Sequence, residues 1–232
     1  MSEAKTPGTD VGRAEGLTEQ RIVDAALAIL DLDGAGALSV AAVARRLGVG
    51  AEAVHARVDG LDGLERTVIE SVLSAVALGS LTDDGVEWTA AVIQFALSLR
   101  ARLFDHPAVA GLIMSGPMDS PSADGPVARD MSEALFVCLA RGGLQTTVRA
   151  HGVYAVLVYV LGSIALDVAE TDGKPPLPRE SERIAARRAA LRDLDPTRWP
   201  RTAAHLAEIA AWTSVDQFVW GLRVLLVGMT AT

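Results

Sequence analysis

Two short stretches with helical apolar spacing, joined by a glycine-containing turn, constrain the N-terminal part of this chain more than any other feature. From Val40 to Leu47, apolar residues recur at i, i+3, i+4 and i+7. Gly48 is placed to end this helix, because glycine readily adopts the left-handed conformation of a helix C-terminus. A second helix, from about Gly50 to Val58, has the spacing that completes a helix-turn-helix.

Another helix is predicted on each side of this pair. The first begins after Thr18, whose hydroxyl can cap it, and carries an apolar stripe at i, i+4 and i+7 from Ile22. Ser39 can cap the next helix. After the pair, a long helix opens at Asp59 or Asp62 and runs toward Leu78.

The remainder of the chain is also predicted to be helical, so the fold class is all-α. Two loops rich in turn-forming residues, MSGPMDSPSADGP and ETDGKPPLP, interrupt it. We expect a flexible tail at residues 1–16, a three-helix helix-turn-helix domain at 17–64 and a larger helical domain at 65–232. Candidate helices of the larger domain span about 62–79, 85–104, 107–114, 126–141, 144–170, 179–193, 200–211 and 213–229.

Composition indicates a folded protein of the cytoplasm. Half of the residues are hydrophobic, 22% are charged, and the net charge is -8. The longest apolar run, Gly152 to Leu166, is shorter than the roughly 20 residues that cross a bilayer, so we expect a buried helix and no membrane contact. No signal peptide is visible at the N-terminus. The single cysteine, Cys138, fits a reducing compartment and is read as a buried thiol, with a redox or catalytic role as the alternative.

A set of residues between positions 17 and 64 follows the pattern of one known DNA-binding domain. They are Leu17, Thr18, Ile22, Ala25, Ala26, Leu30, Gly34, Ser39, Ala44, Leu47, Gly48, Val49 and Leu64. On these residues, the segment 17–64 resembles the N-terminal domain of the TetR family of bacterial transcriptional regulators along its full length. The resemblance implies a homodimer whose two helix-turn-helix units enter successive major grooves of operator DNA, roughly 34 Å apart. It also implies that the domain at 65–232 binds a small molecule and dimerises. Weaker similarities to the family's ligand domains are Trp88, His106-Pro107 and Gly142-Gly143-Leu144.

The chain departs from the family where contacts with the DNA backbone are expected. His55 stands where a phosphate-binding tyrosine is usual, Gly50 where a serine or threonine begins the helix, and Leu61 where a lysine opens the next helix. Between Leu17 and Leu64 there are four arginines and seven acidic residues, a net charge of -3. Because DNA affinity depends on neutralising phosphates, the arginines must gather on one face.

The expected DNA-binding residues combine arginines with small side chains on the second helix of the motif. Alanines offer apolar contact to a thymine methyl, Glu52 can accept from cytosine, and His55 can donate to a base or phosphate. The alternative is a solvated face that has lost its operator. The full set is Ser39, Arg45, Arg46, Gly50, Ala51, Glu52, His55, Ala56 and Arg57.

The last helix carries a continuous apolar stripe, which suits a four-helix interface between two subunits. The alternative is that this stripe only closes the core of the monomer. Its residues are Trp212, Val215, Val219, Leu222, Leu226 and Met229.

Polar, aromatic and methionine side chains on otherwise apolar helices are the candidates for ligand binding. They predict a small hydrophobic ligand, with aromatic or polyketide-like molecules as examples, and each residue has ordinary core packing as its alternative. The set is Trp88, Gln94, Phe95, Met114, Met118, Met131, His151, Tyr154 and Val158.

No catalytic motif, cofactor fingerprint or metal-ligand spacing is found, and the four histidines are dispersed. The function predicted is a ligand-responsive regulator, a repressor released from its operator by the ligand. The alternative is a repurposed relative that no longer binds DNA and binds or transforms a small molecule, for instance with His151 beside Tyr154 or Asp167.

Overall fold

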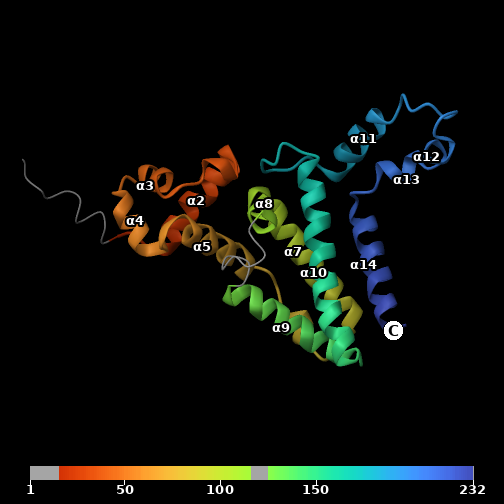
Figure 1. The fold of residues 1–232 in the computed structure, drawn as a ribbon, viewed down its shortest axis with the longest axis horizontal. Helices are drawn as coiled ribbons and strands as arrows, with labels where there is room; N and C mark the ends of the chain where they lie inside the picture. Colours follow the sequence, from red (N-terminus) through yellow and green to blue (C-terminus); the bar gives the residue numbers. More distant parts are fainter. Residues whose placement is uncertain (1–15, 116–124, 232) are drawn as a thin grey trace, which may run out of the picture. The chain divides into compact units, whose positions relative to one another are not determined.

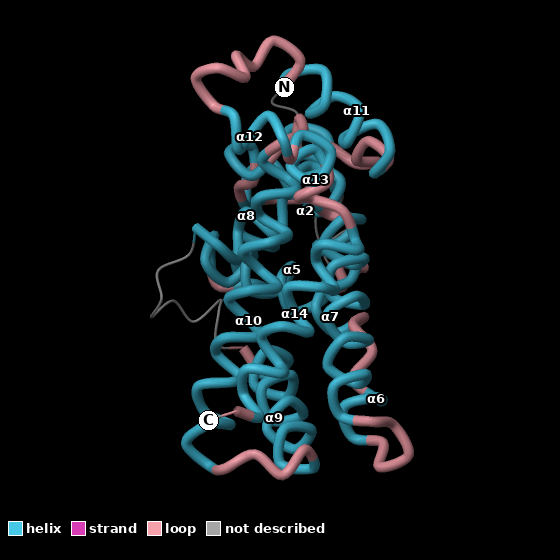
Figure 2. Tube along the Cα trace, turned by 90° about the vertical axis from the view of Figure 1, so that its right-hand side faces the viewer, coloured by secondary structure: helices cyan, strands magenta, loops and turns pink. Residues whose placement is uncertain are grey.

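The computed structural model describes residues 16–115 and 125–231, and the regular elements in these ranges are all helical (Figure 1). In Figure 2 the described part of the tube passes only through helices and loops. The all-α prediction is therefore confirmed. The tail expected at 1–16 lies, apart from Gly16, outside the described residues.

The chain divides into two compact units. The first joins the described residues up to Ala75 with His106–Arg129, and the second joins Val76–Asp105 with the residues from Asp130 onward. The helices of the first are α2 (Glu19–Asp33), the short η1 (Ala35–Ala37), α3 (Val40–Leu47), α4 (Ala51–Val58), α5 (Gly60–Ser74) and α8 (Pro107–Ser115). Those of the second are α6 (Gly79–Thr82), α7 (Trp88–Asp105), most of α9 (Pro126–Arg141), α10 (Thr146–Ala169), α11 (Glu180–Ala190), α12 (Pro200–Ala204), α13 (Leu206–Ala210) and α14 (Val215–Thr230).

The first unit begins as its sequence predicts. The Thr18 hydroxyl accepts a hydrogen bond from the backbone N–H of Arg21 at 3.3 Å, which caps α2. The stripe that starts at Ile22 is buried, and α2 packs on α3 and α5. At the other end of α2, Nδ1 of His106 lies 3.2 Å from Oδ2 of Asp31, so the start of α8 is held against it.

The passage from α4 into α5 is unusually tight. Asp59, at φ 54°, and Gly60, at φ 83°, both adopt left-handed backbone conformations there. One turn later, a Cβ placed on Gly63 would lie 1.5 Å from the carbonyl oxygen of Val58. Only glycine therefore lets α5 start this close to the end of α4. The predicted domain boundary after Leu64 falls inside α5, which continues to Ser74.

The second unit is built around α7, α10 and α14, which pack on one another. Phe95, Val160 and Leu222, one from each helix, are fully buried. The Tyr159 hydroxyl donates to the carbonyl oxygen of Phe218 at 2.9 Å, and the two rings stack with centroids 5.7 Å apart. These contacts join α10 to α14, two helices that Figure 1 shows side by side.

Most predicted helix limits differ from the observed ones by a few residues at either end. The helix predicted at 126–141 has those bounds in the structure, and the one at 144–170 is α10, Thr146–Ala169. The helix predicted at 200–211 is divided, because α12 ends at Ala204 and α13 begins at Leu206.

By length and composition alone, α10 could cross a membrane, since it runs for 24 residues and is strongly apolar. The apolar run from Gly152 to Leu166 is therefore shorter than the helix that contains it. In the second unit, however, Val153, Val156, Val160 and Ile164 are buried. Because α10 packs on α7 and α14, its position is that of a core helix.

Replacing Gly63 with alanine should destabilise the first unit, because the new methyl group would displace the backbone of Val58. We expect a loss of about 1–3 kcal/mol in the free energy of unfolding, typical of overpacking, measured by urea denaturation. The matched control is Gly111→Ala in α8, where no atom lies within 4 Å of the added Cβ. That change should be neutral or stabilise by up to about 1 kcal/mol. Equal stability of Gly63→Ala and the wild type would contradict the tight α4–α5 turn.

Candidate functional site

The turn between α3 and α4 is set by one serine and one glycine. The Ser39 hydroxyl accepts from the Ala42 N–H at 3.1 Å and caps α3. Gly48 adopts the left-handed conformation, with φ 67° and ψ 34°, and its N–H donates to the carbonyl groups of Ala44 and Arg45. Both roles were predicted from the sequence and are confirmed.

Buried side chains then hold α3 and α4 in a fixed relation. Val43 and Ala44 are buried on α3, and Val54 and Val58 on α4. The two helices pack on each other and on α2 and α5. Since every larger apolar side chain of α4 is used in this way, only small or polar residues remain for its outer face.

The expected DNA-binding residues lie on α3, on α4 and at the residues that begin these two helices. All of them are exposed except Ser39, which is partly buried while it caps α3. The Gly50 position begins α4 without a side-chain cap. The exposed residues are Arg45, Arg46, Gly50, Ala51, Glu52, His55, Ala56 and Arg57.

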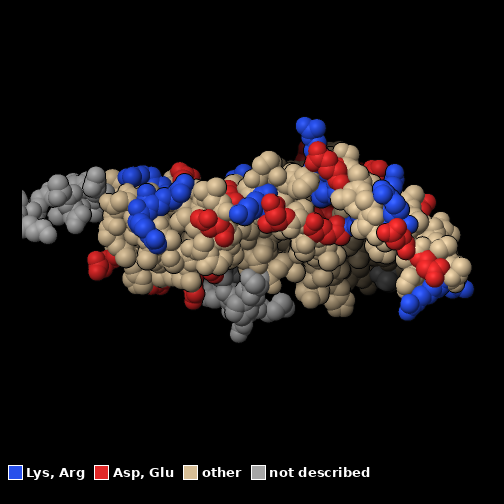
Figure 3. All heavy atoms as spheres, turned by 90° about the horizontal axis from the view of Figure 1, so that it is seen from above, with Lys and Arg blue, Asp and Glu red and all other residues tan. Residues whose placement is uncertain are grey.

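The local charge of this surface differs from that of its surroundings. From Ser39 to Val58 there are three arginines and one acidic residue, Glu52, although residues 17–64 as a whole are negative. On the face drawn in Figure 3, blue Lys and Arg atoms gather at the end that carries α3 and α4. The arginines are thus concentrated where a polyanion would need them.

Acidic residues gather instead at the start of α5. Asp59 and Asp62 are exposed there. Burial, reinforced by the charge of Asp62, raises the pKa of the Glu65 carboxyl above its ordinary value. The start of α5, with its exposed Asp59 and Asp62, therefore repels a phosphate rather than binding one.

The residues expected to bind a ligand do not share one environment. Phe95 and Met131 are buried in the core of the second unit, whereas Gln94 and Met114 are exposed. Trp88 is partly buried, with its ring packed directly on Gly142. Met118 lies outside the described residues. Their assignment to a ligand site stays a prediction.

His151, Tyr154 and Val158 are spaced at i, i+3 and i+7 and so share one face of α10, but that face points away from the core. Tyr154 is 63% exposed. His151 lines a shallow groove between α10 and α14, together with Val224 and Gly228. Periodicity located this face without showing whether it pointed to a cavity or to the surface.

The apolar stripe of α14 is mostly used inside the protomer. Leu222 and Leu226 are fully buried and Met229 is nearly so, while Val215 and Val219 are partly buried and Trp212 is exposed. Leu222, Leu226 and Met229 are therefore used inside the protomer, where α14 packs on α7 and α10, and the assignment of Trp212, Val215 and Val219 to a dimer interface stays a prediction. The exposed apolar residues of α14 lie beside that stripe, at Trp220, Val224 and Val227.

A buried ion pair in the second unit was missed by sequence reasoning. The Nη2 atom of Arg100 lies 2.7 Å from Oδ2 of Asp167, and both side chains are more than nine-tenths buried. Burial raises the pKa of the Asp167 carboxyl, and the hydrogen bond and charge of Arg100 oppose that effect without cancelling it. The available signal was spacing, since Arg100 follows Val92 and Ala96 at helical intervals on an otherwise apolar face.

Of the groups considered for catalysis, His151 and Asp167 lie far apart. His151 and Asp167 stand 16 residues apart on α10, about 24 Å along the helix axis. Cys138 is buried, as predicted; its thiol donates to the Trp88 carbonyl oxygen at 3.4 Å, and burial raises its pKa. Across residues 16–115 and 125–231, His, Cys, Asp and Glu side chains form no group of three placed to hold a metal ion.

Comparison with known proteins connects this architecture to one family. Residues 81–232 match the family model described as tetracyclin repressor-like, C-terminal domain. An HTH-type transcriptional regulator of Saccharopolyspora erythraea is 31% identical over 218 residues, which cover 93% of this chain and 86% of the relative.

Solved structures agree with that match. ActR of Streptomyces coelicolor, a TetR family protein solved in complex with actinorhodin, is 26% identical with a TM-score of 0.73, covering 93% of this chain and 96% of its own. BioQ of Mycobacterium smegmatis, solved with its double-stranded DNA operator, is 20% identical with a TM-score of 0.63, covering 93% and 99%, and supports the fold alone. The chain described above therefore belongs to the TetR family of transcriptional regulators.

Proposed function

We propose that this regulator is a homodimeric repressor that binds operator DNA through α3 and α4 and is released by a small hydrophobic molecule. The single observation that carries the DNA-binding part is the exposed outer face of the helix-turn-helix, where three arginines accompany one acid. Such a regulator acts in the cytoplasm, where its operator is found.

The small side chains of α4 define how this protein would read DNA. Ala51 and Ala56 allow the helix to approach base edges closely and contact thymine methyl groups. Glu52 accepts from a cytosine amino group, and His55 donates to a base or phosphate. Arg45, Arg46 and Arg57 supply the phosphate contacts, so affinity depends strongly on salt.

The dimer is proposed from the apolar side chains that α10 and α14 leave exposed on the protomer. A monomer rarely exposes so many large apolar groups on two adjacent helices, and two copies of such a helix pair form a four-helix interface. A groove of about 480 Å³ between these helices can accept side chains of the second copy. The exposed residues are Tyr154, Val158, Leu166, Trp220, Val224 and Val227.

Ligand control is supported by the 26% identical ActR, which was solved with actinorhodin and also with (S)-DNPA. For the ligand to release DNA, it must bind the non-binding conformation of the dimer more tightly than the binding one. A near-complete switch requires about 5 kcal/mol of difference between the two affinities.

The proposed DNA binding is tested by selecting genomic fragments with the purified protein at about 50 mM salt, where electrostatic attachment is strongest. Enrichment of a discrete palindrome is expected, since a symmetric dimer reads two half-sites. Retention of no fragment would refute the repressor and favour a relative that binds its small molecule without DNA.

Replacing Arg46 or Arg57 with alanine should weaken binding to every fragment, because a phosphate contact carries no sequence information. The slope of log K against log salt should fall by about 1 for each change. Arg188→Ala, which removes an equally exposed arginine from α11, serves as the control and should leave the slope unchanged. Arginine variants that bind like the wild type would exclude these residues from the interface.

Val224→Glu should convert the dimer into a monomer, because a carboxylate would be buried without a partner at the centre of the proposed interface. The mass in solution, measured by light scattering or sedimentation, reports the change. Val137→Glu places the same charge on an exposed valine of α9 and should leave the dimer intact. If the Val224→Glu protein is still a dimer, the interface does not include the exposed face of α14 at Val224.

A further inference from the structure

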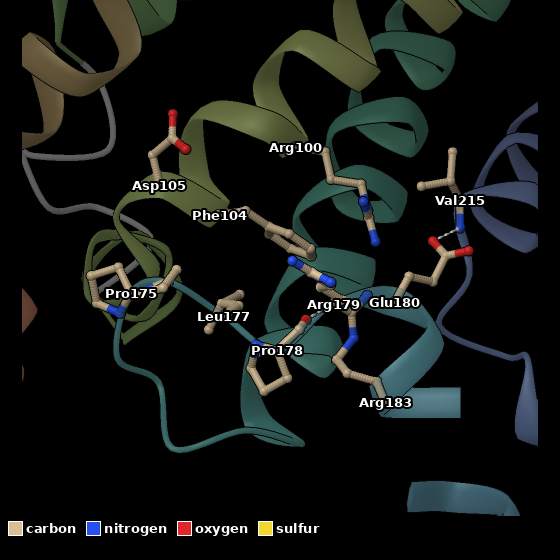
Figure 4. A pocket seen from close by; sticks show the side chains of 11 residues that line it. Arg100, Phe104, Asp105, Pro175, Leu177, Pro178, Arg179, Glu180, Arg183 and Val215 are labelled. Carbon is tan, nitrogen blue, oxygen red and sulfur yellow. Dashed lines mark hydrogen bonds between the residues drawn. The ribbon is translucent and has the colours of Figure 1, made fainter. Parts of the chain in front are cut away.

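The second unit contains a cavity of about 600 Å³ that none of the predicted ligand residues lines. It lies at the C-terminal end of α7, beside the segment 175–178 and the first residues of α11 and α14 (Figure 4). Its volume is within the range of small-molecule sites in proteins. Its walls combine apolar groups with three arginines, which is the combination that an anion with an apolar body requires.

We propose that this cavity binds a planar aromatic carboxylate, with the ring against Phe104 and the carboxylate at the guanidinium groups of Arg100 and Arg183. The inference rests on the proposed function to the extent that the molecule is also the effector of the regulator.

The lining of the cavity carries three arginines and two acids, Asp105 and Glu180, and each acid has a partner outside the proposed ligand position. Asp105 lines the cavity and lies 3.8 Å from Arg102, a residue that does not line it. The Glu180 carboxylate accepts from the Val215 N–H at 2.9 Å, the dashed line in Figure 4, and so is held by the start of α14. Asp167 engages one nitrogen of Arg100.

Two arginine side chains of the lining each carry a buried nitrogen without an acceptor in the described part of the chain. The Nε atoms of Arg100 and Arg183 are buried and have no hydrogen-bond partner among the residues that the structure describes. The other nitrogens of Arg183 donate to the carbonyl oxygens of Pro178, at 2.9 Å, and Thr213, at 3.4 Å, which orients the group. Unpaired buried donors are costly, and a carboxylate would satisfy them with charge-assisted hydrogen bonds.

The apolar side of the cavity favours a flat ring. The Cζ atom of Arg100 lies 4.2 Å from the Phe104 ring centroid, and that of Arg183 lies 5.6 Å from it. The Phe104 ring and both guanidinium groups are therefore close enough together for one aromatic ligand with an anionic group to meet all three. Three of the four residues from Pro175 to Pro178 are prolines, whose fixed φ stiffens the opposite wall.

The test compares 2-naphthoate with its neutral analogue 2-naphthamide, titrated calorimetrically into the full-length protein. Naphthoate should bind about tenfold more tightly or better, since hydrogen bonds to charged groups contribute that much. Arg183→Ala should reduce naphthoate binding to the level of the amide. Arg188→Ala, on the same helix but outside the cavity lining, is the control and should retain the preference.

A second variant keeps the test decisive if Arg183→Ala unfolds. Leu177→Trp fills the cavity without removing an arginine and should abolish binding of both compounds. Equal affinity for the acid and the amide, absence of binding, or naphthoate affinity unchanged in either variant would overturn the proposal.

The same compound is then added to the protein on its operator. One outcome is that naphthoate binds through Arg183 but the protein stays on the DNA. The cavity would then still be an anion site, but it would not be the effector site. If the protein binds no DNA, the proposal that it is a repressor is wrong. The calorimetry would still show whether the cavity binds the carboxylate.

Discussion

The second unit depends on α10 packing between α7 and α14. Its buried face contributes Val156, Val160 and Ile164 to the core. The Tyr159 hydroxyl satisfies a backbone carbonyl oxygen of α14. Arg100 of α7 and Asp167 of α10 form a buried ion pair that would leave an uncompensated charge if either residue were removed alone. The three helices are therefore held by apolar contacts along their length and by a charge pair at one end.

This packing leaves two different surfaces for function. On the outside of α10 and α14, large apolar side chains are exposed, and these are the residues of the proposed dimer interface. At the end that holds the ion pair, the cavity beside Phe104 combines arginines with proline and leucine walls. The first surface is largely apolar and the second contains arginines, which is why we propose a protein partner for one and an organic anion for the other.

In the first unit, packing determines what the DNA-binding surface can contain. Val54 and Val58 turn inward to hold α4, so the outer face keeps alanines, Glu52, His55 and Arg57. The arginines of α3 lie beside that face, whereas acidic residues gather at the start of α5. A domain with a negative total charge can thus still present a locally positive surface.

Local features of the sequence were sufficient for the helical fold, the Ser39 and Gly48 positions and the family resemblance, because caps and apolar periodicity act over a few residues. They were insufficient for the faces of α10 and α14. Tyr154 and Leu222 both lie on largely apolar helices, yet one is exposed and the other buried. Which stripe becomes core depends on neighbours distant in the chain. The Arg100–Asp167 pair, 67 residues apart, shows this most clearly, since only tertiary packing brings the two charges within 2.7 Å.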